Sequence, residues 1–190
     1  MAISGLVYDR TLFSDTSSGL SKLALIFVDI AFHRRGPAAL PASRFLFVLV
    51  LVAYLTVSLL ALQINWPLSQ AVGPLVADVT FCMAFFWATL QITQHGGRFW
   101  QTVTALLGAE TFLSLVALPL LVLRSAATGN ETFEPVMVLL LTAVLFWSID
   151  VGGFILSRAL EQAYVVGVLI MVGYVISSFM LGELLFPSVE

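Results

Sequence analysis

Five long apolar runs are the feature that most constrains the fold of this chain of 190 residues. A helix needs roughly 20 mainly apolar residues to cross about 30 Å of hydrocarbon. Five segments meet that requirement, at approximately residues 45–64, 72–92, 99–123, 135–156 and 163–186. Charged residues make up 10% of the chain, whereas a typical soluble domain has about 25%. The chain therefore has too few charged residues to cover a water-exposed surface. The sequence therefore predicts an all-α integral membrane protein.

The connections between these runs are short and carry the residues that interrupt helices. Asn65-Trp66-Pro67 and His95-Gly96-Gly97-Arg98 follow the first two runs. Because short connections join antiparallel neighbours, residues 44–190 are expected to form a five-helix transmembrane bundle. Residues 1–19 are expected to form a cytoplasmic N-terminal segment.

Residues 20–43 precede the bundle and combine a short helix with a Pro-rich entry. Its apolar part is about half the length of a membrane span, which favours an amphipathic helix at the membrane interface or tucked under the bundle. Leu20, Leu23, Phe27 and Ile30 form its apolar stripe. We expect Leu23, Phe27 and Ile30 to anchor this segment.

The distribution of basic residues predicts the orientation. Short cytoplasmic loops carry an excess of Lys and Arg, and the opposite side of the predicted bundle has Arg124 alone. The other seven basic residues fall on one side: Arg10, Lys22, Arg34, Arg35, Arg44, Arg98 and Arg158. The N-terminus is therefore predicted to be cytoplasmic and the C-terminus to lie outside, in the periplasm if the membrane is a bacterial inner membrane.

Signatures of catalysis and cofactor binding are missing from the sequence. The two histidines, His33 and His95, lie at the cytoplasmic edge, so a transmembrane bis-histidine haem is excluded. The sequence contains no His-Glu-x-x-His zinc motif, no Gly-x-Ser-x-Gly elbow and no phosphate-cradling loop. A net charge of −3 argues against nucleic acid as a partner. We expect no catalytic site, cofactor or metal.

Three acidic residues within the predicted spans require an explanation. An ionised Asp at a helix centre costs about 2.5 to 3.5 kcal/mol on insertion scales. At about 1.5 Å per residue, Asp78 is expected roughly 9 Å below the outer end of its helix, Glu110 near mid-membrane and Asp150 roughly 10 Å from the cytoplasmic end. Three interpretations stay open: a proton or cation path, pairing with a basic group from a partner subunit, or hydrogen bonds to hydroxyls such as those of Thr80, Thr104 or Tyr174.

Small residues recur four positions apart in the last two spans, a spacing that lets helices approach closely. The predicted packing faces contain Ser148, Gly152, Gly153, Gly173, Ser177 and Gly182. They favour packing within the bundle, and the same faces suit self-association or contact with other membrane protein subunits.

The entry segment carries a family resemblance. The stretch from Phe27 to Ser43, FVDIAFHRRGPAALPAS, resembles the entry of proteobacterial Yip1-like proteins, where a short amphipathic helix ends at Gly-Pro and a Pro-Ala-Ser step leads into the first span. Gly173-Tyr174 is similar to a Gly-Tyr pair of the wider Yip1 family. The resemblance implies a cytoplasmic N-terminal segment, five spans and an outward C-terminus.

Two functions fit the sequence. The first is a non-enzymatic membrane scaffold or accessory subunit that binds other membrane proteins through its helix faces. The alternative is a small transporter, or a module that conducts protons or cations through its buried carboxylates.

Overall fold

The computed structural model describes residues 23–126, Gly129 and residues 133–187. Within this part of the chain, five helices are long and apolar enough to cross a membrane, and no residue is in a strand. They are α2 (Arg44–Leu62), α3 (Leu68–Ile92), α4 (Phe99–Ala126), α5 (Phe133–Leu160) and α6 (Tyr164–Leu185). The prediction of an all-helical fold with five candidate spans is confirmed.

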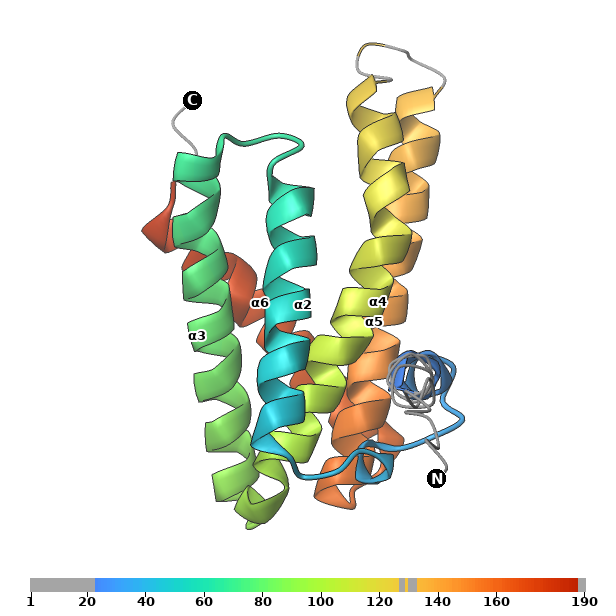
Figure 1. The fold of residues 1–190 in the computed structure, drawn as a ribbon, viewed down its shortest axis with the longest axis vertical. Helices are drawn as coiled ribbons and strands as arrows, with labels where there is room; N and C mark the ends of the chain where they lie inside the picture. Colours follow the sequence, from blue (N-terminus) through green and yellow to red (C-terminus); the bar gives the residue numbers. More distant parts are fainter. Residues whose placement is uncertain (1–22, 127–128, 130–132, 188–190) are drawn as a thin grey trace, which may run out of the picture.

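The five helices form a bundle in which α4 and α5 are central to the packing. In Figure 1, α2, α3, α4 and α5 run along the long axis, whereas α6 is tilted and crosses behind them. Helix α5 packs against both α4 and α6, and α2 packs mainly against α4. The α4–α5 hairpin extends past the α2–α3 hairpin at the upper end of Figure 1. Helix α6 therefore connects the two sides of the bundle, since it packs on α5 and also reaches α3.

Short connections join the helices, as the sequence predicted. The turn η2 (Gly96–Arg98) leads directly into α4, and the Ser43 hydroxyl caps α2 by accepting a hydrogen bond from the Leu46 amide at 3.4 Å. His33, Gln94 and Glu161 follow helical segments with φ values of 59°, 63° and 54°. This left-handed conformation is the usual way to end a helix and turn the chain sharply.

Helices α5 and α6 approach each other closely at glycine residues. A Cβ atom added to Gly167 would lie 2.1 Å from the carbonyl oxygen of Gly153, and one added to Gly152 would lie 2.6 Å from the Met171 sulfur. The predicted packing residues Gly152 and Gly153 thus lie at this contact. Gly167, which the sequence reasoning did not single out, lies opposite them.

The other predicted packing residues of α6 lie elsewhere on the helix. Nothing lies within 4 Å of a Cβ added to Gly173 or Gly182, and Ser177 is exposed. These positions do not contribute to close packing among the described residues.

A short helix at residues 23–31 lies across the flank of α4 and α5 and is seen nearly along its axis in Figure 1. Ile30 is fully buried, and the ring of Phe27 lies where a side chain on Gly108 would be. The Trp147 indole donates a hydrogen bond to the Ala31 carbonyl at 3.1 Å. The predicted anchors thus contact protein, as expected for a helix tucked against the bundle.

The face of this short helix that turns away from the bundle is also apolar. Leu25 on this face is 62% exposed. Phe32 follows the helix, is 52% exposed, and packs its ring 5.3 Å from that of Trp147 on α5. The predicted segment 1–19 and Leu20 lie outside the described residues.

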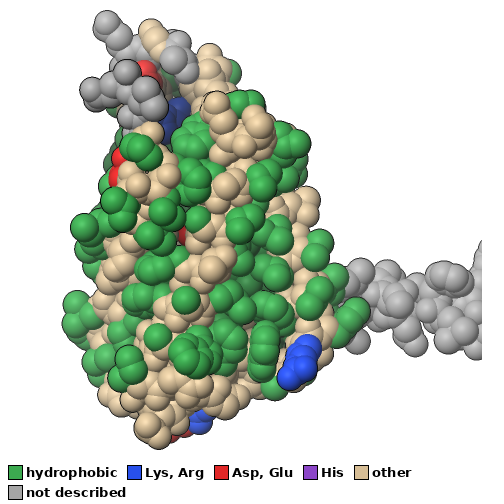
Figure 2. Space-filling model, turned by 90° about the vertical axis from the view of Figure 1, so that its left-hand side faces the viewer, with side chains coloured by type: hydrophobic (Ala, Val, Ile, Leu, Met, Phe, Trp, Pro, Cys, Tyr) green, Lys and Arg blue, Asp and Glu red, His purple; other side chains and the backbone are tan. Residues whose placement is uncertain are grey.

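The exterior of the bundle suits hydrocarbon better than water. Figure 2 shows a face covered largely by hydrophobic side chains, with Lys and Arg near its two ends. Exposed large apolar residues occur on every one of the five long helices, for example Val52, Trp87, Leu115, Phe146 and Phe179. This pattern, with the five candidate spans, identifies an integral membrane protein.

Candidate functional site

Asp78 of α3 is held by hydroxyl groups from two other helices. The Tyr54 hydroxyl on α2 donates to Oδ2 at 2.9 Å, and the Ser178 hydroxyl on α6 donates to Oδ1 at 3.0 Å. The Tyr174 hydroxyl lies 3.5 Å from the same Oδ1. Tyr174 and Ser178 are four residues apart, so both point to one side of α6. Asp78 therefore joins α2, α3 and α6 through three oxygen donors.

Glu110 of α4 has fewer hydrogen bonds. The Ser148 hydroxyl on α5 donates to Glu110 Oε1, and no other hydrogen bond to this carboxyl group is found among the described residues. An ionised carboxylate offers about four lone-pair positions. Glu110 therefore has more unused acceptor positions than Asp78, whose carboxyl oxygens already face three hydroxyl groups.

Both carboxyl groups line one cavity inside the bundle. The cavity has a volume of about 320 Å³ and receives residues from all five long helices, which places it at the lower end of the roughly 300–1,000 Å³ typical of small-molecule pockets. Its walls are Tyr54, Asp78, Cys82, Phe86, Leu106, Leu107, Glu110, Ser148, Met171, Tyr174, Val175, Ser178 and Phe179. None of these residues is basic.

Aromatic rings form one side of this cavity. Tyr174 packs on Phe86 with ring centroids 4.8 Å apart, and it stacks on Phe81 at 5.8 Å with an interplanar angle of 11°. These contacts fix the Tyr174 ring and aim its hydroxyl at Asp78. The cavity therefore has acidic, hydroxyl and aromatic groups in its walls.

Asp78 and Glu110 lie at similar heights in the bundle, counted along their helices. Helix α3 begins at Leu68 rather than Val72, so Asp78 lies roughly 15 Å inside its helix at about 1.5 Å per residue. Glu110 lies roughly 16 Å inside α4, counted from Phe99. Since these two helices run in opposite directions, the two acids meet near the middle of the bundle.

Asp150 lies apart from that cavity, within the candidate span Phe133–Leu160. Its side chain is 44% exposed and lies 3.2 Å from His33 Nε2, and the Tyr164 hydroxyl donates to it. Asp150 therefore lies at the edge of the bundle, beside the short N-terminal helix.

The hydroxyl partners differ in part from those expected. Thr80 and Thr104 donate to carbonyl groups of their own helices, at Val76 and Trp100, whereas Tyr174 does approach Asp78. Sequence reasoning missed Tyr54 as a partner and read Ser148 as a packing residue. A polar residue in the middle of an apolar span, as Tyr54 is, was the available signal.

The described residues contain no group of three or more His, Cys, Asp and Glu side chains that could hold a metal ion. No protein-family model, no curated protein and no solved structure matches the chain. The resemblance to the Yip1 family stays a prediction.

Proposed function

We propose that this protein binds a small organic cation in the cavity between Asp78 and Glu110, as the binding step of a small membrane transporter. The observation that carries the proposal is the convergence of two carboxyl groups on one cavity without a basic residue in its walls. Two carboxylates in this cavity favour a positively charged ligand, because the positive charge compensates for the hydration that the carboxylates lose on burial.

The walls favour an organic cation over a metal ion. Phe86 and Tyr174 offer aromatic faces, which attract ammonium groups, and Leu106, Leu107 and Met171 offer surface for hydrocarbon. Ca²⁺ and Mg²⁺ take six or more oxygen ligands, whereas the two carboxylates here are already partly hydrogen-bonded to the surrounding hydroxyls. Glu110 is the better candidate for the primary ligand contact because Ser148 is its one hydroxyl partner among the described residues.

The full-length protein in liposomes allows a direct test with a size series from methylammonium to tetraethylammonium. We expect a saturable, potential-driven uptake of one size class, reduced about tenfold or more in Glu110→Gln, since hydrogen bonds and ion pairs to charged groups contribute about 1.5–3 kcal/mol. Glu183→Gln is the matched control, because Glu183 is an acid of α6 that does not line this cavity.

Two results would contradict the proposal. If no amine binds to the folded protein, the acids hold the helices together and do not form a ligand site. If a pH gradient alone drives flux and amines do not compete, the acids conduct protons.

An accessory subunit or scaffold is the second candidate function. It is favoured by Gly173 and Ser177, which lie four positions apart on α6 with no close neighbour at Gly173. A small-xxx-small pair that is not used within the bundle suits a helix of another subunit or of a second copy. Purification in mild detergent tests this hypothesis: stoichiometric co-purifying subunits would support it, and a lone monomer would contradict it.

We also propose the bacterial inner membrane as the location, with the N-terminus cytoplasmic. The distribution of Lys and Arg, seven of eight on one side of the predicted topology, supports the orientation. The resemblance of the entry segment to proteobacterial Yip1-like proteins supports the bacterial membrane.

A further inference from the structure

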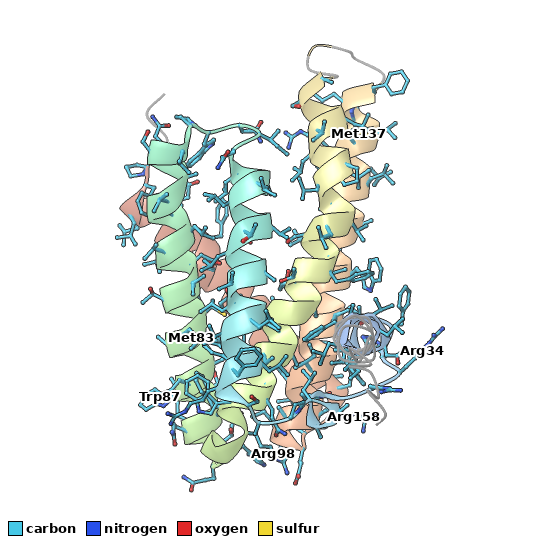
Figure 3. All side chains as sticks on the ribbon, in the orientation of Figure 1. Arg34, Met83, Trp87, Arg98, Met137 and Arg158 are labelled. Atoms are coloured by element: carbon cyan, nitrogen blue, oxygen red, sulfur yellow. The ribbon has the colours of Figure 1, made fainter. Side chains whose placement is uncertain are left out.

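A second cavity, of about 400 Å³, lies at the end of the bundle where α4 begins and α5 ends. Unlike the first cavity, it is strongly basic. Four arginines line it: Arg34, Arg35, Arg98 and Arg158. Figure 3 shows Arg98 and Arg158 at this end of the bundle, with Arg34 on the side of the short N-terminal helix.

The arginines in this cavity outnumber their acidic partners. Arg34 and Arg35 both reach Asp29, at 3.9 and 3.1 Å. Arg98 pairs with Glu161 and donates to the Ala159 carbonyl at 3.1 Å. The fourth, Arg158, has no ion pair among the described residues. Four positive charges therefore face two carboxylates, which leaves a surplus of two.

Arg158 is exposed, and its packing contacts do not use its hydrogen-bond donors. Its Cγ lies 3.6 Å from the position that a Cβ on Gly36 would take, so the aliphatic stem runs along the backbone of the entry turn. Its guanidinium carbon lies 5.4 Å from the centroid of the Phe154 ring. A guanidinium held against a ring keeps its N–H edges free for an acceptor.

We propose that this cavity binds a phosphate group, with Arg158 as the primary ligand and Arg98 and Arg35 as supporting charges. A phosphate monoester carries close to two negative charges, which matches the surplus of two. The planar guanidinium fork binds phosphate oxygens in pairs. The cavity lies at the ends of two spans, where basic pockets between helices meet lipid headgroups. The phosphate comes from a lipid such as phosphatidic acid or from a phosphorylated solute.

The test uses the full-length protein in mild detergent and three probes: dioctanoyl phosphatidic acid, dioctanoyl phosphatidylcholine and inorganic phosphate. Titration calorimetry should show binding of phosphatidic acid and little binding of phosphatidylcholine. Arg158→Gln should weaken that binding on the order of tenfold or more. Arg158→Lys should fall between wild type and Arg158→Gln, since it keeps the charge and loses the fork.

Arg44→Gln is the matched control, because Arg44 is an exposed arginine at the start of α2 that stands over Trp100 and does not line the cavity. We expect it to bind phosphatidic acid like wild type. Competition by inorganic phosphate at similar concentration would assign the site to a soluble phosphorylated solute, and absence of competition would assign it to a lipid. Equal binding of the two lipids, or equal losses in Arg44→Gln and Arg158→Gln, would overturn the proposal.

Discussion

Adding one methyl group to Gly167 tests the close backbone contact between α5 and α6. A Cβ atom there would lie 2.1 Å from the Gly153 carbonyl oxygen and 2.7 Å from the Ser157 amide nitrogen. Both are backbone atoms, so no side-chain rotation relieves the overlap. Gly167→Ala therefore forces α5 and α6 apart, and the packing of Met171 on Gly152 is disturbed with them.

The magnitude follows from two opposing effects. Overpacking a well-packed interior costs about 1–3 kcal/mol, and replacing Gly by Ala inside a helix gains about 0.8–1 kcal/mol of intrinsic propensity. Gly173→Ala lies in the interior of the same helix and receives the second effect alone, because nothing lies within 4 Å of the added Cβ. The difference in unfolding free energy between the two variants should therefore be about 1–3 kcal/mol, the overpacking cost.

Thermal or dodecyl sulfate unfolding, followed by circular dichroism at a fixed detergent concentration, measures that difference. We expect Gly173→Ala to be at least as stable as wild type and Gly167→Ala to be less stable than both. Equal stability of the two variants would show that α5 and α6 do not approach as closely as described, and would refute the reasoning.

Three further predictions follow from other contacts. Asp78→Asn should keep most of the stability, whereas Asp78→Leu should lose about 1–3 kcal/mol for each hydroxyl left without a partner, as measured by thermal unfolding. With the native cysteine replaced by alanine, a cysteine at Gly97 should be labelled from the cytoplasmic side and one at Ser69 from the outside; the reverse result would reject the proposed orientation. The Arg98 guanidinium lowers the pKa of Glu161, so the ion pair stabilises the protein above the ordinary carboxyl pKa and is lost as the pH falls through the lowered value. The difference in melting temperature between wild type and Glu161→Gln should therefore shrink in acid, and a constant difference would contradict the role of the charge.

The helices were predictable because hydropathy and length act along the chain. Their ends were less so. Helix α3 begins at Leu68, four residues before the predicted span, since Ser69 and Gln70 are polar but still helical. Helix α5 continues to Leu160 for the same reason. A window of apolar residues finds the part of a helix that lies in hydrocarbon, and polar turns at its ends are outside that window.

The site was less predictable than the fold because it depends on how helices are rotated and tilted. The sequence identified Asp78 and Glu110 as residues that need partners, and it proposed hydroxyl groups as one kind of partner. It could not show that the two acids share a cavity, because their depths were counted along separate helices. Nor could it show that Tyr54 and Ser178, far apart in the chain, reach the same carboxyl group.

The number of donors around each acid distinguishes a structural role from a ligand-binding role. Asp78 has three hydroxyl neighbours and joins three helices, so its hydration is largely replaced and its removal should damage the fold. Asp150 contacts His33 and Tyr164 at the edge of the bundle, and its side chain is 44% exposed. Glu110 faces the same cavity as Asp78 with a single hydroxyl donor among the described residues. Since a buried carboxyl group with few partners is costly, Glu110 is the position where an added positive charge brings the largest gain.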